Sequence, residues 1–299
     1  MRNYFGVHNH TDRSNIRLLD CINRPKALID IAIELGLSGI AITDHECLSA
    51  HMEVNQYAKK LLTTNPDFTI ALGNEIYLTN DREPGQKYYH FILIAKDALG
   101  HKALRELSSI AWYNSYVDRR MERVPTTKEE LAEVVLKYKG HLIATTACIG
   151  GELGTNILHI LDCDRVGDTV NRMTYHNNII EFIQYCKNLF DDDFYIECAP
   201  SSTADQIAVN KMLLKIASAF DVKLVPGTDS HYLTSKERPI HKAYLNSKNG
   251  EREVDDFYYY SHLMDNEEAF DNLYPYFTEE EFADMCASTI DIMNKIKGY

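Results

Sequence analysis

Short apolar runs alternate with amphipathic stretches along most of the chain. The apolar runs predict strands over 4–8, 39–43, 68–78, 88–96, 140–147, 193–199 and 222–228. The stretches between them carry apolar residues at helical spacing and predict helices over 25–36, 49–62, 98–112, 127–138, 169–190 and 204–220. Strands that alternate mostly with helices are typical of a parallel α/β sheet or barrel.

Beyond residue 235 the pattern becomes irregular. The segment that follows is polar, and one more amphipathic helix is predicted over 278–297. We therefore expect an α/β barrel domain over 1–235 and a C-terminal helical extension over 236–299 that packs on it.

Composition narrows the class of protein. The 299 residues are 45% hydrophobic and 25% charged, which is ordinary for a globular protein. The chain has no apolar run of roughly 18 residues and no apolar signal-peptide core, so we expect a cytoplasmic protein without membrane association. Its seven cysteines are an odd number without a CxxC pair, which favours scattered reduced thiols over a disulfide framework.

The net charge of −13 also bears on partners. Affinity for duplex nucleic acid comes largely from Lys and Arg, so an acidic chain is a poor non-specific binder. A metal site can still offset acidic residues locally. We expect any nucleic acid either to be held locally or to be presented by a partner.

Candidate chemistry begins at the first predicted strand, which ends in His8-Asn9-His10. Residues two apart on a strand project from the same face, so the two imidazoles lie side by side. Protonated rings would repel each other there, which favours neutral rings that share a divalent metal.

Other residues of metal-ligand type follow predicted strands far along the chain. In a βα barrel the loops at the carboxyl ends of the strands converge on one cleft, so these side chains are expected to meet. They are Asp44, His45, Glu75, Cys148, Asp229 and His231, and His90 lies within an apolar strand.

These motifs together resemble the PHP (polymerase and histidinol phosphatase) family. The similarity is greatest to the PHP module of bacterial replicative DNA polymerase III alpha subunits, and it covers nearly the whole chain. The text that carries it is FGVHNHTDRSNIRLLD, GIAITDHE, GNEIYL, YYHFILIAKD, ATTACIGGELG, DFYIEC and GTDSHYL.

The resemblance implies a distorted (β/α)7 barrel with a trinuclear metal site. It implies that His8, His10, Glu75 and Asp229, which we take as the catalytic residues, hold one metal ion. Glu75 then bridges to a second ion shared with His90 and Cys148. The remaining ligands, Asp20, His45 and His231, hold the third ion.

Histidine, carboxylate and thiolate ligands suit Zn²⁺, Mn²⁺ or Fe²⁺ better than Mg²⁺ or Ca²⁺. Clustered divalent ions are suited to phosphate-ester hydrolysis. The expected function is therefore that of a metal-dependent phosphoesterase, specifically a 3′–5′ exonuclease of the proofreading type that acts on a single-stranded 3′ end. No polymerase palm follows, so we expect the chain to synthesise no DNA itself. It is expected to be either a module cut out of a longer polymerase or a free-standing relative that serves a separately encoded DNA polymerase or replisome protein.

Two alternatives come from other classes. A small-molecule phosphatase of the histidinol-phosphatase type predicts turnover of phosphomonoesters but not of oligonucleotides. A non-catalytic docking module predicts metal-dependent stability without hydrolysis of either.

Two further sets of residues are candidates for supporting roles. Arg119, Arg120 and Arg123 lie beside aromatic residues in WYNSYVDRRMER and are expected to bind substrate, with a solvated helix end as the alternative. Asp44 adjoins a ligand and is expected to orient an imidazole N–H group from outside the metal coordination.

Overall fold

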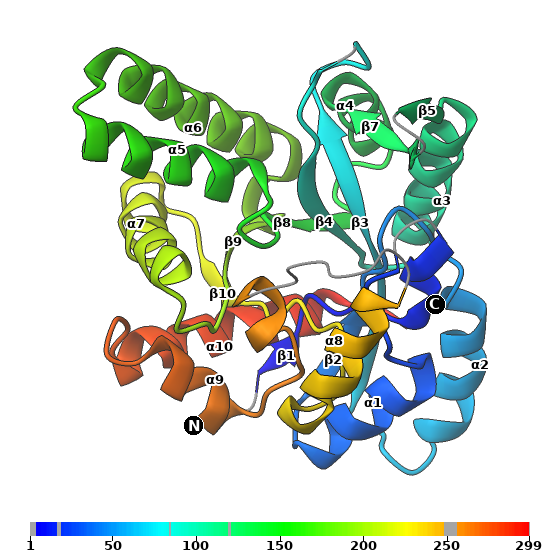
Figure 1. Ribbon diagram of the computed structural model, residues 1–299. Coiled ribbons are helices and arrows are strands. Elements are labelled where there is room, and N and C mark those ends of the chain that lie inside the picture. The colour runs from blue at the N-terminus through cyan, green and yellow to red at the C-terminus, as the bar shows by residue number, and fades with distance from the viewer. Residues whose placement is uncertain (1–3, 17–18, 84, 119–120, 248–255, 299) are drawn as a thin grey trace.

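A strongly curved sheet forms the centre of the computed structural model, which describes residues 4–16, 19–83, 85–118, 121–247 and 256–298 (Figure 1). A parallel bridge between Asn9 and Ser230 joins the segments after the first and last strands, so the sheet closes almost completely into a barrel. The expected α/β barrel and its seven strands are confirmed. In sheet order they are β1 (Phe5–Gly6), β2 (Gly39–Ile42), β3 (Thr69–Thr79), β4 (Tyr89–Ala95), β8 (Leu142–Thr145), β9 (Phe194–Cys198) and β10 (Leu224–Pro226).

One strand runs against the expected direction. β4 is antiparallel to both β3 and β8, whereas the sequence pattern predicted a parallel sheet. The described residues between β3 and β4 contain no helix, so the chain returns directly as a hairpin. The beginning of β4 therefore lies at the edge of the barrel where the parallel strands end.

Three short strands were not predicted. β7 (Pro125–Thr127) pairs with the far end of β3. β5 (Tyr116–Asp118) and β6 (Met121–Arg123) form a separate two-stranded hairpin.

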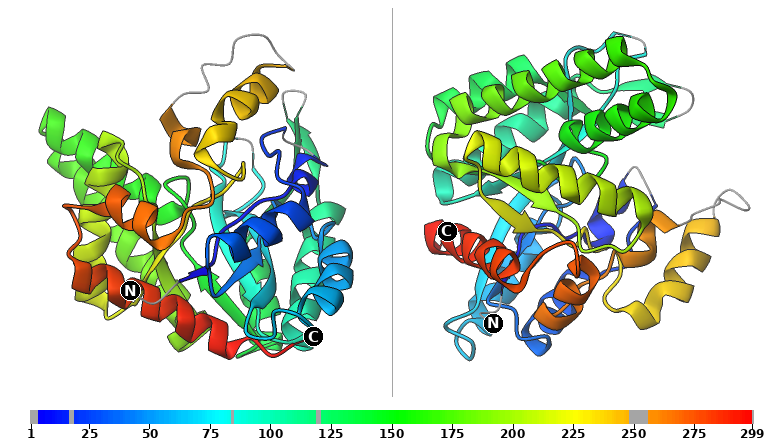
Figure 2. Two further views of the ribbon diagram at one scale, coloured as in Figure 1. Left: turned by 90° about the horizontal axis from the view of Figure 1, so that it is seen from below. Right: turned by 90° about the vertical axis from the view of Figure 1, so that its left-hand side faces the viewer.

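Helices cover the outer face of the barrel (Figures 1 and 2). α5 was not predicted, and it packs beside α6 as a pair of long helices on one side of the molecule. No described helix is both long and apolar enough to cross a membrane. The covering helices are α1 (Pro25–Glu34), α2 (His51–Leu61), α3 (Ala98–Tyr113), α4 (Lys128–Lys137), α5 (Glu152–Val166), α6 (Thr169–Phe190) and α7 (Ala204–Phe220).

Alternate residues of the strands fill the barrel interior, as the two-residue period of a strand requires. This inner core contains Phe5, Val7, Ala41, Ala71, Ile92, Ile94, Ile143, Tyr195 and Val225. Helices on one side and side chains on the other thus bury the sheet on both faces.

The end of the chain contributes to this inner core. After α8 (Arg238–Asn246) and α9 (Asn266–Leu273), helix α10 (Glu279–Lys295) packs against β1 and β10 (Figure 2). Its Ile292 joins the inner core, and Thr289 Oγ1 accepts a hydrogen bond of 2.9 Å from the Phe5 amide. The C-terminal extension therefore completes the barrel core, while the boundary at residue 235 stays a prediction.

Candidate metal centre

Glu75 lies at the centre of a buried cluster of histidines. Its Oε1 is 2.9 Å from His90 Nδ1 and 3.5 Å from His8 Nε2. Its Oε2 is 3.4 Å from His10 Nε2 and also contacts His45 Nδ1. Within the described part of the chain neither oxygen has a hydrogen-bonding partner of suitable geometry. One carboxylate thus reaches four imidazoles without being satisfied by any of them.

The backbone of β3 permits this position. The first part of β3, up to Leu72, pairs with β2, and from Gly73 onward β3 pairs with β4. A Cβ atom there would lie 2.6 Å from the Leu93 carbonyl oxygen and 2.8 Å from Thr43 Cγ2. Only glycine allows the three segments to approach so closely, and Glu75 follows two residues later.

Asp229 approaches the first two histidines from the other side. Its Oδ1 lies 3.1 Å from both His8 Nε2 and His10 Nε2, and these nitrogens are 3.0 Å apart. Asp229 adopts a left-handed backbone conformation with φ of 47°, which an aspartate tolerates better than most residues. Two residues on, His231 Nδ1 donates a 2.8 Å hydrogen bond to the Asp229 carbonyl, which leaves its Nε2 available.

The spacing of these atoms fits a shared cation. Ligand atoms around a tetrahedral zinc ion lie roughly 3.3 Å apart, close to the separations seen here. Three groups each have candidate ligand atoms within 4.8 Å of one another: His8, His10 and Glu75; Glu75, His90 and Cys148; and His10, His45 and His231.

The remaining predicted ligands lie at the margins of the cluster. Asp20 Oδ2 is 3.5 Å from His45 Nε2, and Cys148 Sγ is 3.6 Å from His90 Nδ1. All nine predicted ligands therefore gather at one edge of the barrel. His90 reaches this edge from the beginning of the antiparallel strand β4. Its side chain is 26% exposed, whereas those of the other eight predicted ligands are buried.

The neighbouring imidazoles lower the pKa values of two central carboxyl groups, Glu75 and Asp229. Burial raises the pKa of Glu75, but the charges of His90, His45 and His8 outweigh it and hold the pKa well below its usual value. The same balance, with His8 and His231 as the cations, lowers the pKa of Asp229. Buried carboxylates whose oxygens lack hydrogen-bond donors are costly unless a cation is near. The donor set therefore fits divalent metal ions.

Sequence reasoning missed the residue that holds His8. Glu197 on β9 is buried, and its Oε1 lies 2.6 Å from His8 Nδ1. Its Oε2 accepts a 2.8 Å hydrogen bond from Thr145 Oγ1. A Cβ atom at Gly227 would lie 2.2 Å from Glu197 Oε1, so the glycine leaves the room that this carboxylate needs. The only available signal was an acidic residue inside an apolar strand.

Asp44 holds the loops behind His10. It accepts hydrogen bonds of 2.6 Å from the Thr11 amide and 2.7 Å from Ser14 Oγ. Ser14 Oγ in turn lies 3.4 Å from His10 Nδ1. The link from Asp44 to this imidazole thus runs through a hydroxyl group.

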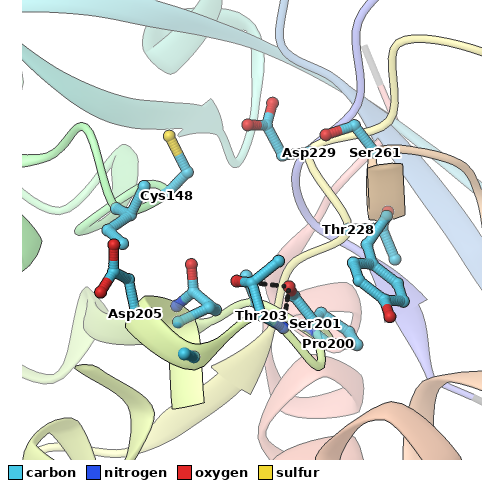
Figure 3. Close-up of a pocket in the computed structure, with 13 residues that line it drawn as sticks. Cys148, Pro200, Ser201, Thr203, Asp205, Thr228, Asp229 and Ser261 are labelled. Atoms are coloured by element: carbon cyan, nitrogen blue, oxygen red, sulfur yellow. Dashed lines mark hydrogen bonds between the residues drawn. The ribbon is translucent and has the colours of Figure 1, made fainter. Parts of the chain in front are cut away.

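A pocket of about 330 Å³ lies beside the cluster and has Cys148 and Asp229 in its wall (Figure 3). Arg123 is not among its described lining residues; its guanidinium lies 5.5 Å from the ring centre of Tyr88. Arg119 and Arg120 lie outside the described residues. The proposed substrate contacts of this segment stay predictions.

Comparison with known proteins agrees with the resemblance. The chain is 40% identical over 306 aligned residues to the probable DNA polymerase YorL of Bacillus subtilis strain 168, covering 98% of this chain but 23% of that protein. It is 32% identical to the DNA polymerase III subunit alpha of Borreliella burgdorferi, covering 78% of this chain and 18% of the relative. The chain thus spans about a quarter or less of the length of these relatives.

A solved structure assigned as a metal-dependent phosphoesterase, from Bifidobacterium adolescentis, superposes with a TM-score of 0.47 at 14% identity. That superposition covers 91% of this chain and 96% of the other. The model of the PHP domain family matches residues 7–201, which hold seven of the nine predicted ligands. The chain therefore belongs to the PHP domain family.

Proposed function

We propose that the chain is a metal-dependent phosphoesterase that removes nucleotides from the 3′ end of a nucleic acid strand. The observation that carries the proposal is the convergence of His8 Nε2, His10 Nε2, Glu75 and Asp229 on one buried point. The five ligand atoms there, which include both Glu75 oxygens, lie 3.0–3.5 Å apart in the pairs measured.

In this proposal the nine side chains hold three divalent ions, Zn²⁺, Mn²⁺ or Fe²⁺. Such ions supply Lewis acidity, which neutralises charge on phosphate oxygens and acidifies a water molecule. The sets are His8, His10, Glu75 and Asp229; Glu75, His90 and Cys148; and Asp20, His45 and His231.

The protein's own groups orient this centre. Glu197 accepts the Nδ1 proton of His8, which directs the Nε2 lone pair of that ring toward Glu75 and Asp229. The Asp229 carbonyl does the same for His231. Glu75 presents one oxygen to His90 and the other to His10, so it is the residue suited to bridge two ions.

The nature of the relatives supports a nucleic-acid substrate. Both are named DNA polymerases, and the similarity to YorL covers 98% of this chain. With a net charge of −13, this chain has little general attraction for nucleic acid. We therefore propose that a separately encoded DNA polymerase or replisome protein delivers the single-stranded 3′ end, and that Arg119, Arg120 and Arg123 contact its phosphates. A soluble, cytoplasmic setting belongs to the same proposal.

The test uses protein reconstituted with Mn²⁺ or Zn²⁺ and end-labelled single- and double-stranded DNA, RNA and a chromogenic phosphomonoester. We expect stepwise shortening from the 3′ end, lost in His10→Ala and Asp229→Ala and retained in His176→Ala, an exposed histidine on α6. Turnover of the phosphomonoester alone would favour the small-molecule phosphatase. Binding of metal without any hydrolysis would favour the docking module, and equal activity in all variants would contradict the site.

A further inference from the structure

We propose that the pocket beside the candidate metal centre holds the nucleoside part of a single terminal nucleotide, while its phosphate lies at the histidine and carboxylate cluster. This inference rests on the proposed function and names the unit of substrate that the site accepts.

The position of the pocket supports this division. Cys148 and Asp229 belong to both the cluster and the pocket wall, and Figure 3 shows Thr203 and Ser201 across the space from them. A ligand that touches the cluster therefore has direct access to the pocket. The volume of about 330 Å³ is at the lower end of the range for small-ligand sites, roughly 300–1,000 Å³. One nucleotide unit suits this space better than a run of several.

The charge of the wall indicates which part of the nucleotide enters. The described lining residues include no lysine or arginine, and beside Asp229 they include a second carboxylate, Asp205. An additional phosphate in the pocket would meet negative charge without a cationic partner. The uncharged base and sugar avoid this repulsion, so the phosphate is left to the cluster.

The wall chemistry fits a base and a sugar. Ile149, Pro200 and Tyr260 contribute apolar and aromatic surface, and aromatic side chains commonly stack on nucleic-acid bases. Ser201 and Thr203 place hydroxyl groups 3.1 Å apart in the same wall. Hydroxyl groups both donate and accept hydrogen bonds, which matches the hydroxyls of a sugar.

Tyr260 and Ser261 bring the C-terminal extension into this site. Both follow the polar segment after residue 235 and line the pocket together with residues of the barrel. Tyr274, in the same extension, is 62% exposed and does not line the pocket, so it offers a matched control.

Binding to Mn²⁺-loaded protein, measured by calorimetry, tests the inference without requiring turnover. The probes are deoxyadenosine 5′-monophosphate, deoxyribose 5-phosphate and inorganic phosphate. We expect the nucleotide to bind at least tenfold more tightly than either other probe. Tyr260→Leu should weaken nucleotide binding about tenfold and leave phosphate binding unchanged. Tyr274→Leu should leave the binding of all three probes unchanged.

A second variant avoids the half-buried Tyr260. Ala204 is exposed at the beginning of α7 and lines the pocket, so Ala204→Tyr fills it. Ser202→Tyr adds the same bulk to an exposed neighbour outside the pocket. Loss of nucleotide binding in Ala204→Tyr but not in Ser202→Tyr supports the inference. Equal affinities for nucleotide and phosphate, or nucleotide binding unchanged in both Ala204→Tyr and Tyr260→Leu, would overturn it. Nucleotide binding without hydrolysis would count against the proposed function instead.

Discussion

Glu197 Oε1 lies 2.6 Å from His8 Nδ1, and both side chains are completely shielded from solvent. Glu197 lies on β9, and His8 follows β1, the strand at the other end of the sheet order. A carboxylate behind a histidine fixes which nitrogen carries the proton and strengthens the other nitrogen as a ligand. This pair therefore joins the barrel framework to the candidate metal centre.

Replacing Glu197 by glutamine should weaken metal binding. The amide keeps the size of the side chain but removes its charge, so we expect Mn²⁺ or Zn²⁺ affinity to fall by about 10–100-fold. Titration against a chromogenic chelator measures the change. Glu133→Gln, at an exposed position of α4, serves as the control. Equal affinity in Glu197→Gln and the control would show that Glu197 has no part in metal binding.

Removing metal should lower the stability of the fold. The carboxylate oxygens of Glu75 have no hydrogen-bonding partner among the described residues, so a bound cation relieves their burial. At a free metal concentration 100 times the dissociation constant, binding contributes about 2.7 kcal/mol. We expect the melting temperature to fall on chelation in the wild-type protein and to change far less in Glu75→Gln. An identical drop in both proteins would place the stabilising metal elsewhere.

The pH dependence of stability should include a contribution from His51. Its Nε2 donates a 2.9 Å hydrogen bond to the Gly73 carbonyl, and its Nδ1 lies 3.1 Å from His101 Nε2. Burial, helped by His101, lowers the pKa of His51 to about 3. An unfolded histidine has a pKa of about 6.5, so between these values the unfolded chain binds the extra proton. Stability is therefore lost as the pH falls below about 6.5.

Between pH 7.5 and pH 5 this loss amounts to about 2 kcal/mol. Urea unfolding with chelator present, compared between wild type and His51→Gln, measures it. The stability advantage of the wild type should shrink by that amount at pH 5, whereas His176→Gln should track the wild type. An advantage that does not change with pH would contradict the role of His51.

Arg123 should contribute to phosphate contact if the β5–β6 hairpin meets the substrate. Its guanidinium lies 3.9 Å from the Asp118 carboxylate, and its side chain is only 26% exposed. Affinity falls with salt, and loss of one phosphate contact makes the negative slope of log affinity against log salt shallower by about one. We expect this smaller slope for the binding of single-stranded DNA by Arg123→Gln, measured between about 50 and 200 mM salt. An unchanged slope would remove Arg123 from the interface.

Ile292 should be important for folding despite its place near the end of the chain. It is fully buried and joins the inner core of the barrel from α10. Ile292→Ala should reduce the free energy of unfolding by about 2–5 kcal/mol. Urea denaturation measures this, with Asp291→Ala as the neighbouring control. A loss below about 0.5 kcal/mol, typical of surface sites, would show that α10 is not part of the core.

The sequence predicted the strands and most helices because apolar periodicity is local. It did not predict α5, because Gly151 and Gly154 at its beginning are poor helix formers. The structure shows what Gly154 is for: a Cβ atom there would lie 2.7 Å from the Ile149 carbonyl oxygen. Nor could periodicity reveal that β4 runs antiparallel, because strand direction depends on whether a hairpin or a helix makes the connection.

The candidate ligands could be found from sequence because several follow strands whose ends converge. The convergence of strand ends did not point to His90, since it lies near the beginning of β4 instead of its end. Glu197 was missed because its partner His8 is 189 residues away, and no local pattern records such a pairing. The pocket was missed for the same reason, since its wall combines the β9–α7 loop with Tyr260 and Ser261.

The measurement that tests the account most directly is anomalous X-ray diffraction at the metal absorption edge from crystals grown with Mn²⁺. We expect strong peaks between Glu75, His8, His10 and Asp229, and their loss in Glu75→Gln crystals grown in the same way. A cluster without anomalous density in crystals that carry manganese at another position would contradict it.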